Sequence, residues 1–217
     1  MLEAVFFDFD GVIFDTPTYY FKHMKAYLHE HNASITDEDI AHLVGMTFGK
    51  KFEYINQKYG LKLERDHFVN TTSEAMMNDI GNNLVLDVSL RKLLNELKKA
   101  KIPIAIASNN SKSNIDYFLN GLGISGYFSK ITAYHDLKEF KPHPETYLLA
   151  AKHFKATPKN CVAIEDTIIG LESAKKAGMK CVAIPNKFSL KNDFSNADLV
   201  ISNFRQLNLW KLKALVK

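Results

Sequence analysis

Short, continuous apolar runs alternate with helical patterns along most of this 217-residue chain. The runs lie at residues 4–7, 102–107, 162–164 and 181–184, with a weaker one at residues 199–201. Runs of this length that are rich in Ile and Val are typical of strands buried on both faces of a parallel sheet. Between them, apolar residues recur at helical spacing at residues 90–97, 115–122, 147–154 and 168–177. The alternation predicts an α/β fold, with an open parallel sheet covered by helices on both faces.

One interval breaks this rhythm, because residues 16–83 contain several helical stretches and no clear strand. Within it, the acidic segment at residues 36–39 could suggest a metal cluster, but it is more typical of a helix N-cap with an acidic first turn. We therefore expect an all-helical insert at residues 16–83. The α/β core domain would then comprise residues 1–15 and 84–217.

The composition is that of an ordinary globular protein, with 46% hydrophobic and 24% charged residues. No apolar run approaches the roughly 20 residues that cross a bilayer, and the N-terminus does not resemble a signal peptide. Cys161 and Cys181 each open a strand-like run, so we expect reduced core thiols in a cytoplasmic protein, with a disulfide as the alternative. The net charge of +4 comes from dispersed basic residues, which predicts no nucleic-acid or membrane partner. Nothing suggests an obligate partner, so we expect a monomer.

Acidic pairs follow two of the predicted strands, where ligands bind in open α/β sheets. Asp8 and Asp10 end the first strand, and two carboxylates this close repel each other unless a cation or a proton lies between them. A turn that happens to be acidic is the alternative. Glu165 and Asp166 end a later strand, and their oxygen ligands suit a hard cation such as Mg²⁺. A capping carboxylate would give the same pattern there.

Two further segments offer groups that could hold an anion. Ser108 and Asn109 follow the strand at residues 102–107 and precede a helix, where hydroxyl, amide and backbone N–H groups can bind phosphate. A simple N-cap is the alternative. Lys141 precedes Pro142 and Pro144, and their restricted backbone would hold the lysine in place. Taken alone, it would be read as an exposed loop lysine.

In this order and at these places, the segments closely resemble the four motifs of the haloacid dehalogenase-like phosphotransferase superfamily. The resemblance covers nearly the whole predicted sheet domain, for which it implies a Rossmann-like core, and the helical insert looks like that superfamily's cap. Residues 8–16 and 165–174 look like the branch of β-phosphoglucomutases and sugar-phosphate phosphatases. The resemblance implies that Asp8 attacks phosphorus to form an aspartyl-phosphate. Asp10 would act as general acid and base, and would be protonated at least part of the time.

The same resemblance implies the groups around the phosphoryl group and the metal. Mg²⁺ would be held by Asp8, the backbone carbonyl of Asp10 and Asp166, with Glu165 close by or coordinating. Phosphate-binding residues would be Ser108, Asn109 and Lys141, of which Ser108 and Lys141 would hold the transferring oxygens, by hydrogen bonding and by charge.

Departures from the branch pattern bear on the choice between mutase and phosphatase. β-Phosphoglucomutases have a His shortly after the first motif and a Lys and an Arg beside the cap's substrate loop. Here Tyr20, Val44 and Phe48 stand at these positions. A mutase must hold two phosphate groups, so the missing basic groups favour a phosphatase, although Lys50 or Lys51 could substitute.

We therefore expect a Mg²⁺-dependent phosphatase of a small phosphorylated metabolite, such as a sugar phosphate. A β-phosphoglucomutase-type mutase is the alternative, and a non-catalytic phosphate-binding relative is disfavoured because the nucleophile is intact. The cap would set specificity. The candidate specificity residues are Tyr20, Thr47, Phe48 and Lys50, and the two aromatic residues could instead belong to the cap's own core.

Overall fold

The structure is a computed structural model that describes residues 1–44, 46–81 and 84–217. Among these residues, six strands form one parallel sheet in the order β3-β2-β1-β4-β5-β6. They are β1 (Ala4–Phe7), β2 (Ile104–Ala107), β3 (Lys130–Thr132), β4 (Cys161–Glu165), β5 (Lys180–Ala183) and β6 (Leu199–Val200). All five apolar runs form strands, as predicted. In chain order, β2 and β3 extend the sheet on one side of β1, and β4 then pairs with β1 on its other side. The order therefore reverses between β1 and β4, where open α/β sheets bind ligands.

Strand β3 was missing from the sequence-based prediction. It has three residues at the edge of the sheet, and two of them, Lys130 and Thr132, are polar. A short edge strand of this kind gives no continuous apolar run.

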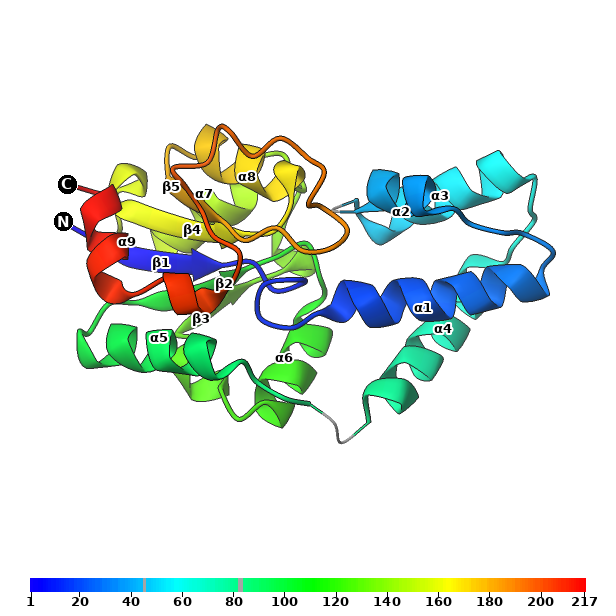
Figure 1. The fold of residues 1–217 in the computed structure, drawn as a ribbon, viewed down its shortest axis with the longest axis horizontal. Coiled ribbons are helices and arrows are strands. Elements are labelled where there is room, and N and C mark those ends of the chain that lie inside the picture. The colour runs from blue at the N-terminus through cyan, green and yellow to red at the C-terminus, as the bar shows by residue number, and fades with distance from the viewer. Residues whose placement is uncertain (45, 82–83) are drawn as a thin grey trace.

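Helices cover both faces of the sheet (Figure 1). One face packs against α5 (Val88–Lys99), α6 (Lys112–Gly121) and α9 (Leu209–Leu215), and the other against α7 (Glu145–His153) and α8 (Ile168–Lys176). In the described part of the chain, short 3-10 helices lie at Ser125–Tyr127, Tyr134–Asp136, Pro158–Asn160 and Phe204–Gln206. This arrangement confirms the predicted α/β fold.

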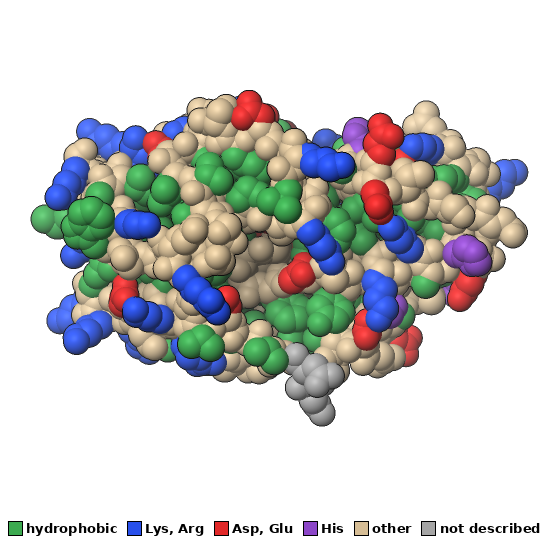
Figure 2. All heavy atoms as spheres, in the orientation of Figure 1, with side chains coloured by type: hydrophobic (Ala, Val, Ile, Leu, Met, Phe, Trp, Pro, Cys, Tyr) green, Lys and Arg blue, Asp and Glu red, His purple; other side chains and the backbone are tan. Residues whose placement is uncertain are grey.

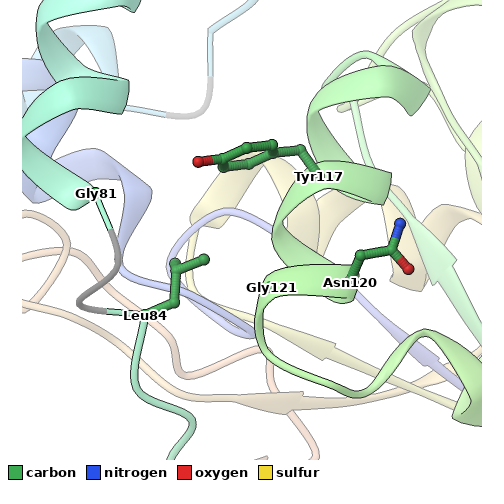
Figure 3. Close-up of a pocket in the computed structure, with 5 residues that line it drawn as sticks. All are labelled: Gly81, Leu84, Tyr117, Asn120 and Gly121. Atoms are coloured by element: carbon green, nitrogen blue, oxygen red, sulfur yellow. The ribbon is translucent and has the colours of Figure 1, made fainter.

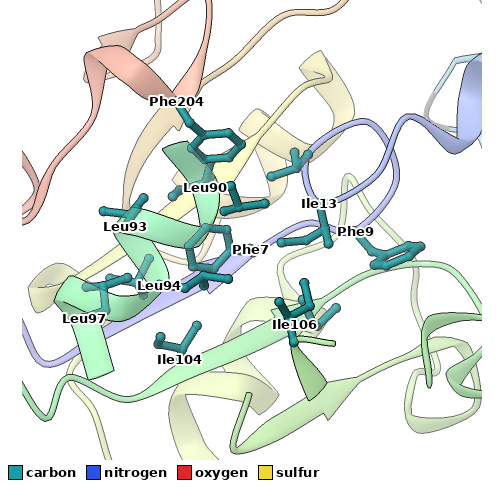
Figure 4. Packing of buried hydrophobic residues seen from close by; sticks show 14 of the residues in the cluster. Phe7, Phe9, Ile13, Leu90, Leu93, Leu94, Leu97, Ile104, Ile106 and Phe204 are labelled. Carbon is teal, nitrogen blue, oxygen red and sulfur yellow. The ribbon is translucent and has the colours of Figure 1, made fainter. Parts of the chain in front are cut away.

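The two faces of the sheet differ in side-chain size. Because successive residues of a strand point to opposite faces, Val5 and Phe7 join one core while Ala4 and Phe6 join the other. The first core is built from large Leu, Ile, Val and Phe side chains, with α5 contributing four leucines (Figure 4). The second is rich in alanine and includes both cysteines, which are buried and unpaired as expected.

The interval 16–83 forms helices α1 (Thr16–Glu30), α2 (Asp37–Leu43), α3 (Phe48–Tyr59) and α4 (Arg65–Ile80). These four helices, called the cap below, lie beside the carboxyl edge of the sheet (Figure 1) and share a separate apolar cluster. The boundaries 15/16 and 83/84 stay a prediction, and residue 83 lies outside the described residues.

Residues 36–39 form the predicted helix start. Thr36 accepts a hydrogen bond from the backbone N–H of Asp39, whose side chain accepts one from Thr36 in return, so the pair forms a capping box. Among the described residues, no helix combines the length and hydropathy that a bilayer span requires.

Candidate active site

Three buried carboxyl groups meet where the sheet order reverses. Asp8 directly follows β1, and Glu165 is the last residue of the adjacent strand β4, with Asp166 next in the chain. One oxygen atom from each of these residues lies within 4.8 Å of the others. The pairing of β1 with β4 brings them together, since Phe7 lies opposite Ile164 in the register. Oxygen ligands alone, at this spacing, fit a hard divalent cation.

Lys141 lies inside this group and is not an exposed loop residue, since its side chain is 5% exposed. Its Nζ atom is 2.7 Å from Asp8 Oδ1 and 2.6 Å from Glu165 Oε1, and it donates to the carbonyl of Ala107 at 2.7 Å. The Tyr147 hydroxyl donates to the same Glu165 oxygen. Burial acts to lower the pKa of Lys141, but the two carboxylates outweigh it and raise that pKa. The lysine is therefore a fixed positive charge beside Asp8.

Asp10 is held by groups from two other segments. The Thr16 hydroxyl, at the start of α1, donates to one of its carboxyl oxygens, and the Asn110 amide nitrogen is 3.1 Å from both. Burial, followed by the charge of Asp8, raises the pKa of Asp10. Asn110 was missed in the sequence; its only signal was its place in the polar run after β2.

Two carboxyl oxygens at this site are buried and have no hydrogen-bond partner among the described residues. They are Oδ1 of Asp166 and Oε2 of Glu165, whereas Asp166 Oδ2 accepts from the Asn186 amide at 2.6 Å. Burial and the neighbouring carboxylates raise the pKa of Asp166 well above its usual range, and burial raises that of Glu165 to about 7. Acidic groups with oxygens left free are what a divalent cation would bind, so the residues present fit Mg²⁺.

Ser108 and Asn109 lie beside Lys141. Ser111, not Ser108, caps α6 by accepting from the N–H of Asn114, so the simple N-cap interpretation does not apply to Ser108. Ser108 is buried, and its hydroxyl oxygen accepts from the backbone N–H of Asn110. The side-chain oxygen of Asn109 accepts from the backbone N–H of Lys141 at 3.2 Å and so supports the lysine's loop.

The candidate specificity residues of the cap and the neighbouring Lys51 lie in different surroundings. Phe48 belongs to the cap's apolar core, with its ring centroid 5.9 Å from that of Phe68, and Thr47 precedes α3 without capping it through its side chain. Lys50 is exposed. Lys51 is half-buried instead, with its Nζ atom 4.8 Å from the centroid of the Tyr20 ring.

A pocket of about 400 Å³ lies away from these carboxylates, beside α6 (Figure 3). Its described lining residues are Gly81, Leu84, Tyr117, Asn120 and Gly121. They offer no carboxylate, lysine or histidine, so the pocket adds no chemistry to the site. On the face seen in Figure 2, lysines and arginines are spread among other side chains and form no stripe.

Residues 5–184 match the family described as Haloacid dehalogenase-like hydrolase, so the chain belongs to this family. The chain is 30% identical to a β-phosphoglucomutase of Bacillus subtilis, in an alignment that covers 96% of this chain and 92% of that protein. It is 26% identical to a phosphorylated carbohydrates phosphatase of Thermotoga maritima over 179 residues, 82% of this chain and 83% of the relative. The solved structure of a β-phosphoglucomutase from Clostridium difficile superposes with a TM-score of 0.85 at 27% identity, covering 100% of this chain and 97% of that one. The family assignment supports the expected enzyme class, a phosphoric monoester hydrolase.

Proposed function

We propose that the protein is a Mg²⁺-dependent phosphatase of a small phosphorylated metabolite, with Asp8 as its nucleophile. The observation that carries the proposal is the position of Lys141, whose ammonium group joins Asp8 to Glu165 at 2.7 and 2.6 Å. A fixed cation beside a buried carboxylate is suited to receive a phosphoryl group, because phosphoryl transfer depends mostly on positioning and charge neutralisation. A sugar phosphate fits the relatives named above.

The two aspartates after β1 would divide the chemistry. A carboxylate oxygen of Asp8 forms a bond to phosphorus, and the bond from phosphorus to the ester oxygen breaks. Asp10 gives its proton to the departing oxygen, then takes a proton from the water that hydrolyses the aspartyl-phosphate. The raised pKa of Asp10 supports the first of these steps, since the side chain must begin protonated. Thr16 and Asn110 would orient it.

Neighbouring groups would bind the phosphoryl oxygens and the metal. Lys141 offsets the phosphoryl charge, Ser108 donates its hydroxyl hydrogen, and Asn109 positions the Lys141 loop. Mg²⁺ would be held by Asp8, the backbone carbonyl of Asp10 and Asp166, with Oε2 of Glu165 also available. When bound, the ion supplies positive charge that stabilises the oxygens of the transferring group. We further propose that residues 16–83 act as a cap that excludes bulk water during transfer.

Phosphate release from a panel of phosphorylated sugars, polyols and nucleotides, with Mg²⁺ or with a chelator, tests the proposal. We expect Mg²⁺-dependent release, reduced about 1,000-fold or more by Asp8→Asn. Asp116→Asn is the control, because that carboxylate lies on α6 and is 41% exposed. An Asp8→Asn variant that still turns over phosphate esters would contradict the assignment.

The second candidate is a β-phosphoglucomutase-type mutase, which the names of two relatives favour. The same panel separates the two when it includes β-glucose 1-phosphate with a bisphosphate primer. Formation of glucose 6-phosphate without free phosphate would identify a mutase.

A further inference from the structure

The loop that follows β5 connects the carboxylate cluster of the core to the cap. It leaves the sheet after Ala183 and turns at residues 187–191, and in Figure 1 it extends from the sheet toward the cap helices. Within this loop, the side chain of Asn186 contacts Asp166, whereas that of Phe188 contacts the cap. Two residues of one short loop therefore reach both parts of the molecule that border the site.

Asn186 holds one oxygen of Asp166 and leaves the other free. Its amide nitrogen donates to Oδ2 of Asp166 at 2.6 Å, while Oδ1 of the same carboxylate is buried and has no hydrogen-bond partner among the described residues. The orientation of the amide is determined, because its oxygen accepts from the backbone N–H of Phe188 at 2.9 Å. A donor of this kind fixes the rotation of a carboxylate and favours its charged form, and a bound cation needs both.

The Asn186 side chain has little room to move. A Cβ atom at Gly11 would lie 2.7 Å from its amide nitrogen. Within the loop, the hydroxyl of the buried Ser189 accepts from the backbone N–H of Asn186 at 3.1 Å, and the Ser189 N–H donates to the Asn186 carbonyl at 2.9 Å. These hydrogen bonds fix residue 186 relative to residue 188, so a displacement of one moves the other.

Phe188 packs the same loop against the cap. Its ring centroid lies 5.1 Å from that of Phe21 on α1, with the two rings edge to face, and it contacts the apolar cluster that the cap helices share. Aromatic pairs favour this arrangement and stabilise a contact beyond the area that they bury. A cap that moved away from the core would lose this contact or pull on the loop that carries Asn186.

We propose that Asn186 is a positioning residue for the cation site, and that Phe188 makes its action depend on the cap. With the cap packed on Phe188, Asn186 stays on Asp166 and cation binding is favoured. Because coupling between two equilibria is reciprocal, a bound cation should favour this position of the cap by the same factor. The inference rests on the proposed function, since it takes Mg²⁺ to bind at Asp8, Glu165 and Asp166.

The positioning role is tested by the rise in melting temperature of the whole chain with increasing MgCl₂, which reports the Kd for the ion. Asn186→Ser is too short to reach Asp166, but its hydroxyl can still accept from the N–H of Phe188. We expect it to raise the Kd for Mg²⁺ by about 10- to 100-fold. The Mg²⁺ concentration for half-maximal phosphate release should rise by a similar factor, with KM at saturating Mg²⁺ within about twofold of wild type.

Amide hydrogen exchange tests the link to the cap. Saturating Mg²⁺ should slow exchange in α1 of the wild-type protein. In Phe188→Ala this effect should be lost, and the Kd for Mg²⁺ should rise by about fivefold or more. Phe188→Leu keeps an apolar side chain against Phe21, so it should retain most of both effects. Exchange in α5 should stay slow in every variant, which separates a local change from loss of the fold.

Leu190→Ala is the matched control, because Leu190 lies in the same loop and is 67% exposed. It should change neither the Kd for Mg²⁺ nor exchange in α1. A wild-type Kd in Asn186→Ser would overturn the proposal, as would a wild-type response of α1 to Mg²⁺ in Phe188→Ala. The absence of any Mg²⁺ effect on α1 in the wild-type protein would overturn it too.

These binding measurements separate the inference from the proposed activity. If the wild-type protein releases no phosphate from any ester while both variants alter Mg²⁺ binding as expected, the phosphatase proposal fails and the role of the loop stands. If phosphate is released and both variants bind Mg²⁺ as the wild-type protein does, the role of the loop fails alone.

Discussion

Two glycines determine how closely the carboxyl groups of the site can approach the backbone. Gly11 has a φ of 81°, and a Cβ atom there would lie 2.1 Å from Oδ2 of Asp166. At Gly170, near the start of α8, a Cβ atom would lie 1.9 Å from Oε2 of Glu165. Both distances are far below van der Waals contact, so any side chain at either position would move a carboxylate of the site.

We expect Gly170→Ala to reduce activity and to bring none of the stability that alanine usually adds to a helix. Alanine favours a helix by about 1 kcal/mol over glycine, so an unhindered site would be stabilised. Here the methyl group would displace Glu165, and with it Lys141, at a steric cost of about 1–3 kcal/mol. Phosphate release should fall about tenfold or more, and the midpoint of urea unfolding should not rise.

The control for this substitution is Gly126→Ala, because a Cβ atom at Gly126 would have no atom within 4 Å. It should leave activity unchanged. If Gly170→Ala were as active as Gly126→Ala and more stable than wild type, the close packing of Glu165 against α8 would be wrong.

At the residue scale, the sequence predicted those site residues that directly follow strands. Asp8, Ser108 and Asp166 are carried to the sheet edge by the strands before them, and strand periodicity is visible in a sequence. For the cap, the sequence left Lys50 and Lys51 as equal alternatives, although neighbouring residues on a helix point about 100° apart and differ in their surroundings. The structure separates the two, since Lys50 is exposed whereas Lys51 is half-buried over the Tyr20 ring.

At the scale of elements, one buried carboxylate joins α2 to α3. Asp39 accepts from the Thr36 backbone within the capping box, and from the hydroxyls of Tyr54 and Tyr59 at 2.8 and 2.6 Å. Lys58 forms an ion pair with it. Burial acts to raise the pKa of Asp39, but these hydrogen bonds outweigh it and hold that pKa well below its usual range. The carboxylate must therefore stay charged for the two helices to remain joined.

Asp39→Asn should destabilise the cap by about 2 kcal/mol or more, because the amide loses the charge and places a donor against other donors. Amide hydrogen exchange should quicken in α2 and α3 and stay slow in α5. Asp37→Asn is the control, since Asp37 begins the same helix with its side chain 96% exposed. Equal exchange rates in the two variants would contradict a structural role for Asp39.

The helices and strands were predictable where their pattern is long or their capping residues are distinctive. The N-cap of α2 with its acidic first turn and the four leucines of α5 were both evident from the sequence, whereas the reciprocal hydrogen bond of the capping box is seen only in the structure. Strand β3 was not, because an edge strand has fewer neighbours to bury it and so needs fewer apolar residues.

At the scale of the whole molecule, core and cap enclose more negative than positive charge. Asp8, Asp10, Glu165 and Asp166 come from the core, whereas Lys141 and Lys51 supply the cations close to them. The sequence could predict each of these segments but not the net charge that they enclose together. The distance between a cap lysine and a core carboxylate depends on how the two parts pack. This balance makes stability depend on pH and on a bound cation.

In Mg²⁺-free buffer, we expect the melting temperature to fall as pH rises from about 5.5 to 8. The pKa of Glu165 is raised to about 7, and those of Asp10 and Asp166 are raised as well. Over this range the folded protein still holds protons that the unfolded chain, with ordinary carboxyl pKa values near 4, has released. The contribution of these three carboxyl groups to stability is therefore fully present below about pH 4, and it is lost as pH rises through their folded-state pKa values. A fall of about 5 °C or more is expected for a chain of this length.

Carboxyl groups with lowered pKa values do not reverse this trend, and a cation should abolish it. Lys51, whose pKa burial lowers, acts in the opposite direction, as one group against three. The pKa values of Asp37, Asp39, Asp79 and Asp198 are lowered, so their contribution is complete before pH 5.5 is reached. Mg²⁺ binds the deprotonated carboxylates, so adding it should flatten the curve and raise the melting temperature most at pH 8. Asp166→Asn removes one of the crowded charges, and should stabilise the Mg²⁺-free protein at pH 8 while weakening the response to the ion. A melting temperature that stays level or rises with pH in the Mg²⁺-free wild type would mean that the packed carboxyl groups do not share the site in the way their distances indicate.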